Sequence, residues 1–270
     1  QGSRGLPIHS GQCGIRVNMT RKHDLLGELE AFYANEGILS TAFTCKFKTE
    51  CKAGCDSFTG PKSAFVSSGY EAGSLPRLLF LSLDSGGGSK SPKQRLPGAV
   101  RAQNEIECDP SAIHKGKHWY RTHEIAWHIL RKFKRDLSLK DTQAYFAHAN
   151  SAKCCMNKSG RKQADKVLFK NCRTYLPQEI AILAPDILVT QGGEAKDSIL
   201  SICDEVGRAY DEFARIVVIG GRSMFWLHTH HPANYGAFNR QRDFDRESQI
   251  VRGWESYAGK ISQYIKRKGK

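Results

Sequence analysis

Three residues with reactive side chains each stand directly after an apolar segment of the chain. Asp84 follows one in FLSLDSGG, Asn150 another in FAHANSAKC, and His231 a third in FWLHTHHPAN. A carboxylate can stabilise developing positive charge and orient a water molecule, and an imidazole can donate to developing negative charge. A primary amide offers both a donor and an acceptor to the polar edge of a ring. Together these groups suit a reaction in which positive charge develops on one part of the substrate while another part leaves as an anion.

The patterns around these residues indicate which elements must position them. Apolar runs predict strands within residues 77–84, 143–150, 186–193, 214–221 and 223–232. Helical spacing predicts helices over 22–36, 120–135, 161–176 and 241–267. A further helical segment is expected to begin at Pro177, and another to follow the strand within 186–193 and to end at about 204. Residues 86–115 are polar and predict a loop. The alternation predicts an α/β fold with a mostly parallel central sheet, whose carboxyl edge gathers the three residues.

The charge balance favours a polyanionic partner. The chain has 41 Lys and Arg residues against 27 Asp and Glu, a formal net charge of +14. Basic residues cluster at 153–173, in LRKFKRD at 130–136 and from Lys266 onward, where they can neutralise phosphates or simply form a solvated surface. No apolar run approaches the roughly 20 residues that a membrane helix needs. We therefore expect a cytoplasmic protein that binds nucleic acid and no membrane.

The order of the three strand ends resembles the uracil-DNA glycosylase superfamily, and in particular its iron–sulfur branch. There a first strand ends in a Gly-rich motif, a second in Asn followed by Lys-Cys, and a third in His-Pro-Ser or His-Pro-Ala. The resemblance covers about residues 45–240. It implies a three-layer α/β/α fold over residues 45–270, preceded by an N-terminal extension, 1–44, with one helix. We expect the protein to be a monomer.

The resemblance also implies roles for the site residues. Asp84 would activate water, His231 would donate to the base oxygen, and Asn150 would read the base edge. Trp119, in GKHWYRTHE, resembles the aromatic residue that stacks on the flipped base, and Gly86 would let the backbone approach the ligand. Each residue has an ordinary alternative, since a lone Asp after a strand is often a cap and a lone Trp is often core.

The nine cysteines favour metal binding or burial over a disulfide framework. By resemblance, two cysteines before the first strand and two around the second bind a [4Fe–4S] cluster. The matching residues here are Cys51, Cys55, Cys154 and Cys172. Cys45 and Cys155 are alternative ligands, and tetrahedral zinc is the alternative metal because it takes the same four thiolates. The cluster would hold the basic loop 156–171 where DNA can meet it.

Two basic segments are expected to contact DNA. The first contains Lys158, Arg161 and Lys162. The second, HPANYGAFNRQR, follows the His motif, and in the family this loop displaces the target base. Tyr235 would act as a wedge and Arg240 would meet phosphate, unless this is ordinary loop packing.

The substrate is suggested by departures from the family pattern. The iron–sulfur enzymes usually read Gly-Glu-Ala-Pro-Gly after the first strand, whereas this chain reads SLDSGGG at 82–88. Three glycines suit a pocket larger than uracil needs, which favours a modified pyrimidine such as glucosylated hydroxymethylcytosine in phage DNA. The expected enzyme is monofunctional because no lysine is well placed to form a Schiff base. The alternatives are uracil repair, an inactive DNA-binding module, and a metal-dependent nuclease built on His228, His230 and His231.

Overall fold

The computed structural model describes residues 24–53, 58–86, 91–107, 118–156, 165–232 and 254–269. Its strands are β1 (Phe58–Thr59), β2 (Phe65–Val66), β3 (Leu78–Asp84), β4 (Phe146–Ala152), β5 (Cys155–Met156), β6 (Ile187–Gln191), β7 (Glu205–Ala209), β8 (Ala214–Ile219) and β9 (Arg222–Thr229). Its α-helices are α1 (Leu25–Asn35), α2 (Lys48–Lys52), α3 (Ser68–Glu71), α4 (Pro97–Glu107), α5 (His118–Leu130), α6 (Lys166–Cys172), α7 (Leu176–Leu183), α8 (Gly193–Ile202) and α10 (Trp254–Lys268). Short 3-10 helices are η1 (Ser40–Ala42), η2 (Pro92–Arg95), η4 (Asp141–Tyr145) and η5 (Arg173–Tyr175).

One mixed sheet of seven strands, in the order β2-β4-β3-β6-β9-β8-β7, forms the centre of the molecule. Strands β4, β3, β6 and β9 run parallel, and the pairings at both margins are antiparallel. The central strands β3, β4 and β6 are almost wholly buried, as expected of parallel strands covered on both faces. The predicted α/β fold is confirmed, with parallel pairing confined to the centre of the sheet.

The antiparallel margin comes partly from a tight hairpin between β8 and β9. Gly220 and Gly221 join the two strands with φ angles of 57° and 72°. A two-residue hairpin turn of this kind needs positive φ at both positions, which glycine adopts without strain. The sheet is therefore extended without a crossover helix.

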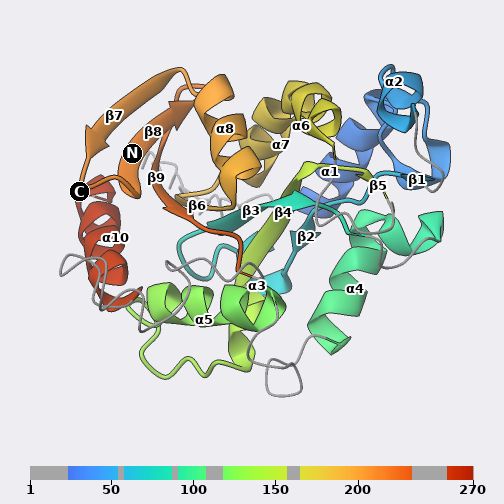
Figure 1. Ribbon diagram of the computed structural model, residues 1–270. Coiled ribbons are helices and arrows are strands. Elements are labelled where there is room, and N and C mark those ends of the chain that lie inside the picture. The colour runs from blue at the N-terminus through green and yellow to red at the C-terminus, as the bar shows by residue number, and fades with distance from the viewer. Residues whose placement is uncertain are drawn as a thin grey trace, which may run out of the picture.

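Helices cover both faces of the sheet (Figure 1). One core contains α1, α6, α7 and α8 against one face of the sheet, and the other contains α5 and α10 against the opposite face. Helix α1 buries Leu25, Leu29 and Tyr33 in the first of these cores. None of the helices in the described ranges is long and apolar enough to cross a membrane.

The expectation of a loop throughout residues 86–115 is wrong. Helix α4 occupies Pro97–Glu107 although few of its residues are apolar. Tertiary polar contacts hold it: Arg101 donates to the carbonyl of Val66 at 2.6 Å and pairs with Glu71 at 2.8 Å. Its buried Val100 packs in the same core as α5 and α10. Contacts with distant segments, rather than a local apolar pattern, therefore stabilise this helix.

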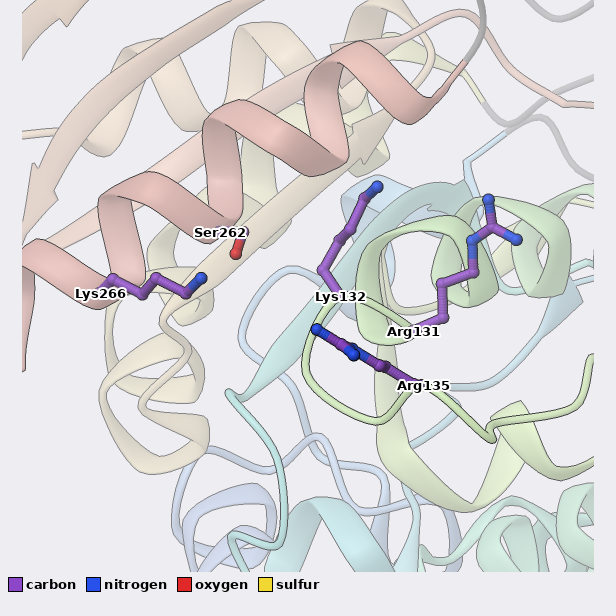
Figure 2. A pocket seen from close by; sticks show the side chains of 5 residues that line it. All are labelled: Arg131, Lys132, Arg135, Ser262 and Lys266. Carbon is purple, nitrogen blue, oxygen red and sulfur yellow. The ribbon is translucent and has the colours of Figure 1, made fainter.

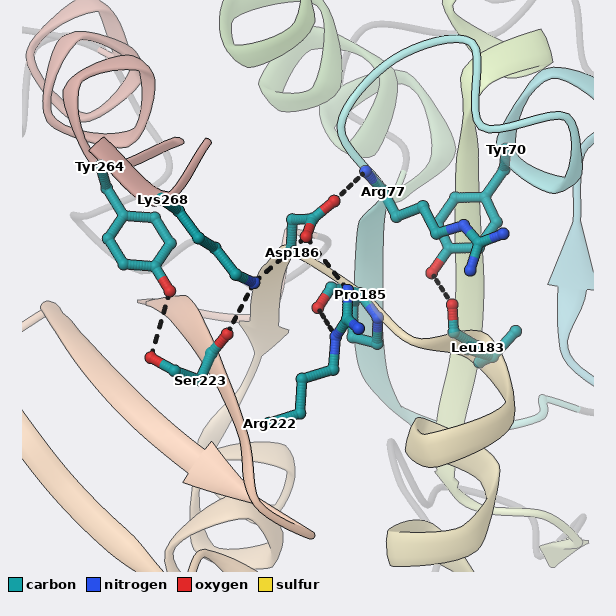
Figure 3. Close-up of polar contacts among 9 residues, drawn as sticks. All are labelled: Tyr70, Arg77, Leu183, Pro185, Asp186, Arg222, Ser223, Tyr264 and Lys268. Atoms are coloured by element: carbon teal, nitrogen blue, oxygen red, sulfur yellow. Dashed lines mark hydrogen bonds and ion pairs between the residues drawn. The ribbon is translucent and has the colours of Figure 1, made fainter. Parts of the chain in front are cut away.

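Asp186 ties together the amino edge of the sheet. Its carboxylate accepts a hydrogen bond from the backbone of Arg77, just before β3, and pairs with Arg222 at the start of β9, both at 3.1 Å. Lys268 at the end of α10 reaches the same carboxylate and the carbonyl of Ser223 (Figure 3). The amino edge is thus closed by structural contacts, and the carboxyl edge carries the candidate site.

Candidate active site at the carboxyl edge of the sheet

Asp84, Asn150 and His231 come from three strands of the parallel centre. Asp84 is the last residue of β3, and Asn150 lies on neighbouring β4 in register with Ser82. His231 lies two residues beyond the end of β9. The charge of Asp84 acts on the His231 imidazole, which places the two side chains in one electrostatic environment.

The Asn150 side chain is largely buried and makes no hydrogen bond among the described residues. The residue is 6% exposed, and no side-chain hydrogen bond of Asn150 is found within the described ranges. Its amide atoms are not among the buried side-chain atoms that lack a partner in the described part of the chain, so they are open to solvent. The amide is therefore available to bind the polar edge of a ligand.

Asp84 also shapes the turn that follows β3. Its Oδ1 accepts a hydrogen bond of 2.8 Å from the backbone N–H of Gly86. Gly86 has a φ of 62°, and a side chain added there would meet open space. One carboxylate oxygen of Asp84 thus acts as a cap of the turn, as the alternative interpretation of this residue predicts. It does not conflict with a chemical role, because a carboxylate has two oxygens.

His231 stacks on His118, the first residue of α5. Their ring centroids are 5.0 Å apart and the planes differ by 15°. Burial lowers the pKa of His231, partly offset by the charge of Asp84. His231 is therefore neutral at neutral pH and can donate through a ring N–H without carrying a charge of its own.

A buried polar network lies beneath this stack, and the sequence interpretation missed it. The Ser82 hydroxyl donates to Gln191 Oε1 at 2.6 Å, and His148 Nε2 lies 2.8 Å from the same hydroxyl oxygen. His118 Nε2 is 3.1 Å from Gln191 Oε1, which only accepts, so His118 carries its proton on Nε2. Because Ser82 already donates to Gln191, His148 also donates through Nε2. The network fixes both tautomers and the orientation of His118.

A period of two along the strands is the signal that could have found this network. Ser82 lies two residues before Asp84, and His148 two before Asn150, so each shares a sheet face with the residue singled out. Gln191 ends β6, the strand that was assigned no site residue. The sequence interpretation omitted the polar residue at the end of β6.

Gly192, directly after β6, allows the strand ends to approach. Its φ is 104°, and an added Cβ would lie 2.8 Å from Leu83 and 3.4 Å from the Cβ of His231. Its backbone N–H donates to the carbonyl of Thr229 at 2.8 Å. A side chain here would push the β6 turn away from β3 and from His231.

Trp119 lies in an aromatic cluster that packs against the core formed with α5 and α10. Its ring is 5.0 Å from that of His148 and makes edge contacts with Phe65 and tilted contacts with Phe146. The residue is half-buried. Its neighbour His118, rather than Trp119, is the ring that stacks with His231.

We expect the free energy of unfolding to fall as the pH drops below about 6.5. Burial lowers the pKa of His118 to about 3 and the pKa of His148 well below its usual value. As the pH falls, the unfolded chain therefore takes up these protons before the folded protein does. Below the unfolded pKa, each histidine lowers the free energy of unfolding by up to ~1.4 kcal/mol per pH unit, and above that pKa it has no effect. Urea unfolding between about pH 7 and 5 measures the slope. His148→Gln should make it shallower, and an unchanged slope would contradict this account.

Four cysteines line one small cavity on the other side of β4. They are Cys45, Cys51 on α2, Cys154 and Cys172 on α6. Three of the sulfurs accept N–H donors: Cys45 from the backbone of Phe47, Cys172 from that of Lys153, and Cys51 from the Asn171 amide. Burial raises the pKa of Cys154 and raises that of Cys172 to about 11, so these thiols ionise only if a metal displaces the proton.

The four thiols line one cavity but, among the described residues, do not form a recognisable site for a single ion. Within the described ranges, no three His, Cys, Asp or Glu side chains are grouped to hold a single metal ion. Soft sulfur donors are those that iron–sulfur clusters require, so the chemistry of these four lining residues fits a cluster. Cys155 is buried but does not line this cavity.

Lys153, counted from the sequence among the basic residues of 153–173, is not at the surface. It is 1% exposed, and its ammonium pairs with Glu179, which is 0% exposed. The Tyr33 hydroxyl contacts the same carboxylate and accepts from the backbone N–H of Ala64 at 3.2 Å. This pair therefore joins β4, α7 and α1 and does not meet phosphate.

Several predicted site residues lie outside the described residues: Cys55, Lys158, Arg161, Lys162, Tyr235 and Arg240. The proposed histidine metal site is not formed by the part of the chain that the structure describes. There His228 Nδ1 lies 3.1 Å from the Thr190 hydroxyl, while His231 stacks on His118.

A sequence model described as “Uracil DNA glycosylase superfamily” matches residues 106–255, more than half of the 270 residues. The match takes in Asn150, Cys154, Cys172 and His231, whereas Asp84 and Cys51 precede it. No curated protein matches the chain.

Proposed function

The chain belongs to the uracil DNA glycosylase superfamily, and from this premise we propose that it is a monofunctional DNA glycosylase that releases a modified pyrimidine and leaves an abasic site. The observation that carries the proposal is the Asn150 amide, which makes no hydrogen bond in the described ranges and is open to solvent although the residue is only 6% exposed. It lies at the same sheet edge as Asp84 and His231. This trio supplies a reader of the base edge, a carboxylate and a neutral donor.

Each residue has a defined task in the proposed reaction. The Asp84 carboxylate stabilises the positive charge that develops on the sugar and orients the attacking water. The neutral His231 imidazole donates a hydrogen bond to the base oxygen as negative charge develops there. Its stack on His118, which the Ser82–Gln191 network orients, holds the ring in place without requiring it to be charged.

A base larger than uracil is supported by the surroundings of the site. Gly86 presents no side chain and faces open space. His118 adds a half-buried polar ring next to His231, where an added hydroxyl-rich substituent would find hydrogen-bonding groups. We propose glucosylated hydroxymethylcytosine in phage DNA as the substrate, with anti-phage defence as the role, and uracil repair as the alternative.

The cysteine cavity is proposed to hold a [4Fe–4S] cluster through Cys45, Cys51, Cys154 and Cys172. When bound, the cluster would supply a cross-link between α2, the end of β4 and α6, and no redox step is required of it. The N–H groups of Phe47, Lys153 and Asn171 would stabilise the negatively charged sulfurs.

Iron content distinguishes Cys45 from Cys55 as the fourth ligand. We expect Cys45→Ser to lose most of its iron and acid-labile sulfide, because the remaining three thiols bind the cluster weakly, while Cys55→Ser keeps both. Cys203→Ser is the matched control, because Cys203 is half-buried and does not line the cavity. Loss of iron from Cys55→Ser with retention in Cys45→Ser would reverse the assignment. Stoichiometric zinc without sulfide would show that the site holds zinc and not a cluster.

Base release tests the function directly. The protein is incubated with uracil-containing DNA, unmodified DNA and phage DNA carrying glucosylated hydroxymethylcytosine. The freed base is identified by mass spectrometry, and abasic sites are revealed by alkaline cleavage. Release of the glucosylated base alone supports the proposal, and release of uracil selects repair. Strand breaks without alkali indicate a nuclease, and no release from any of the DNAs favours an inactive binding module.

A further inference from the structure

A basic hollow lies between the end of α5 and the last turns of α10, away from the candidate active site. It has a volume of about 450 Å³ and is lined by Arg131, Lys132, Arg135, Ser262 and Lys266. Figure 2 shows Lys132 and Arg135 on one side of it and Ser262 and Lys266 on the other. Its lining therefore consists of four cations and one hydroxyl.

Its positive charge is only partly neutralised. Glu255 pairs with Arg131 and, at 2.7 Å, with Lys132. Among the described residues, Arg135 and Lys266 have no ion pair. Four cations against one carboxylate leave a net positive charge, which costs repulsion in the free protein and attracts a polyanion.

The shape of the lining also indicates an anion with several oxygens. Arg131 is held by stacking on the Trp127 ring, 4.1 Å from its centroid. A guanidinium presents a rigid fork of donors, an ammonium a point charge, and the Ser262 hydroxyl a further donor. Phosphate oxygens are acceptors that match all three.

The distance from the candidate active site suits a duplex. His118, which stacks on His231, begins α5, and Arg131 follows the helix end. At 1.5 Å per residue, the two are about 20 Å apart along the helix axis. That span equals roughly six base-pair steps of about 3.4 Å.

We propose that the basic hollow is a second phosphate-binding site, which binds the part of the DNA duplex that flanks the target base. The proposal rests on the proposed glycosylase function for its substrate. It predicts that the enzyme contacts the backbone about six base pairs from the excised nucleotide. It gives the distant cations of α5 and α10 a role in substrate affinity.

Salt-dependent binding of an unmodified duplex of about 30 base pairs tests the basic hollow. We expect Arg135→Gln with Lys266→Gln to weaken binding roughly tenfold and to reduce the slope of log affinity against log salt by about 1 to 2. The control, Arg208→Gln with Arg267→Gln, removes the same charge from exposed residues outside the hollow. A duplex of about 8 base pairs with the target base at its centre, held at the active site, is too short to reach the hollow and should bind the wild type and the first variant equally.

Equal slopes for the two double variants would overturn the proposal. So would a variant that loses affinity for inorganic phosphate but keeps its affinity for the long duplex, since the ligand would then be a small anion. Base release by the same samples separates the two proposals. If the enzyme releases the base but the slope is unchanged in the first variant, only the proposal for the basic hollow is rejected. If the slope is reduced but no base is released, only the proposed glycosylase function is rejected.

Discussion

The Asp84→Asn variant is expected to release the target base about 1,000-fold more slowly than the wild type. Asparagine has the same shape and keeps an oxygen that can accept from the Gly86 N–H, so the turn after β3 should be preserved. What is lost is the negative charge that stabilises the cationic sugar and orients water. Single-turnover base release with saturating enzyme measures this effect on the chemical step.

Asp197→Asn is the matched control for charge. Asp197 is exposed on α8, so its replacement raises the net charge equally without touching the site. Both variants should bind duplex DNA at least as tightly as the wild type, because a repulsive charge is removed. An Asp84→Asn variant within tenfold of the wild-type rate would leave Asp84 only its role as a cap of the turn.

The Lys153→Met variant should lose about 3–5 kcal/mol of the free energy of unfolding. Lys153 and Glu179 are almost completely buried, and Tyr33 makes its hydrogen bond to the same carboxylate. Burial, and then the neighbouring Glu179, raises the pKa of Tyr33, so its hydroxyl stays neutral and cannot replace the lost cation. Urea unfolding at neutral pH, followed by circular dichroism, gives the difference.

A double variant separates the pair from general damage to the core. Lys153→Met with Glu179→Leu removes both charges and should recover most of the lost stability, because two apolar side chains then share the space. Lys170→Met on the exposed face of α6 is the control. A loss below about 1 kcal/mol in Lys153→Met would mean that the buried charge of Glu179 needs no partner.

Local pattern was sufficient for the strands that carry the site. The apolar runs around Leu81, Ala149 and Val189 are buried strands, as predicted, because a parallel strand covered on both faces is apolar throughout. The prediction failed for α4, whose helix depends on Arg101 reaching Val66 and Glu71. A pattern of apolar residues carries no information about such distant polar contacts.

Taken alone, the sequence determined the α/β class, the positions along the chain of the strands that carry the site, and the family, since these follow from periodicity and from short motifs at strand ends. Only the tertiary structure decided which side chains meet. Tyr33 and Glu179 are 146 residues apart in the chain, and Ser82 and Gln191 are 109 apart. The burial of Lys153, the stack of His118 on His231, and the entry of Cys45 into the cysteine cavity depend on such contacts. Periodicity specifies the face on which a side chain lies, whereas its partner is set by how distant faces pack.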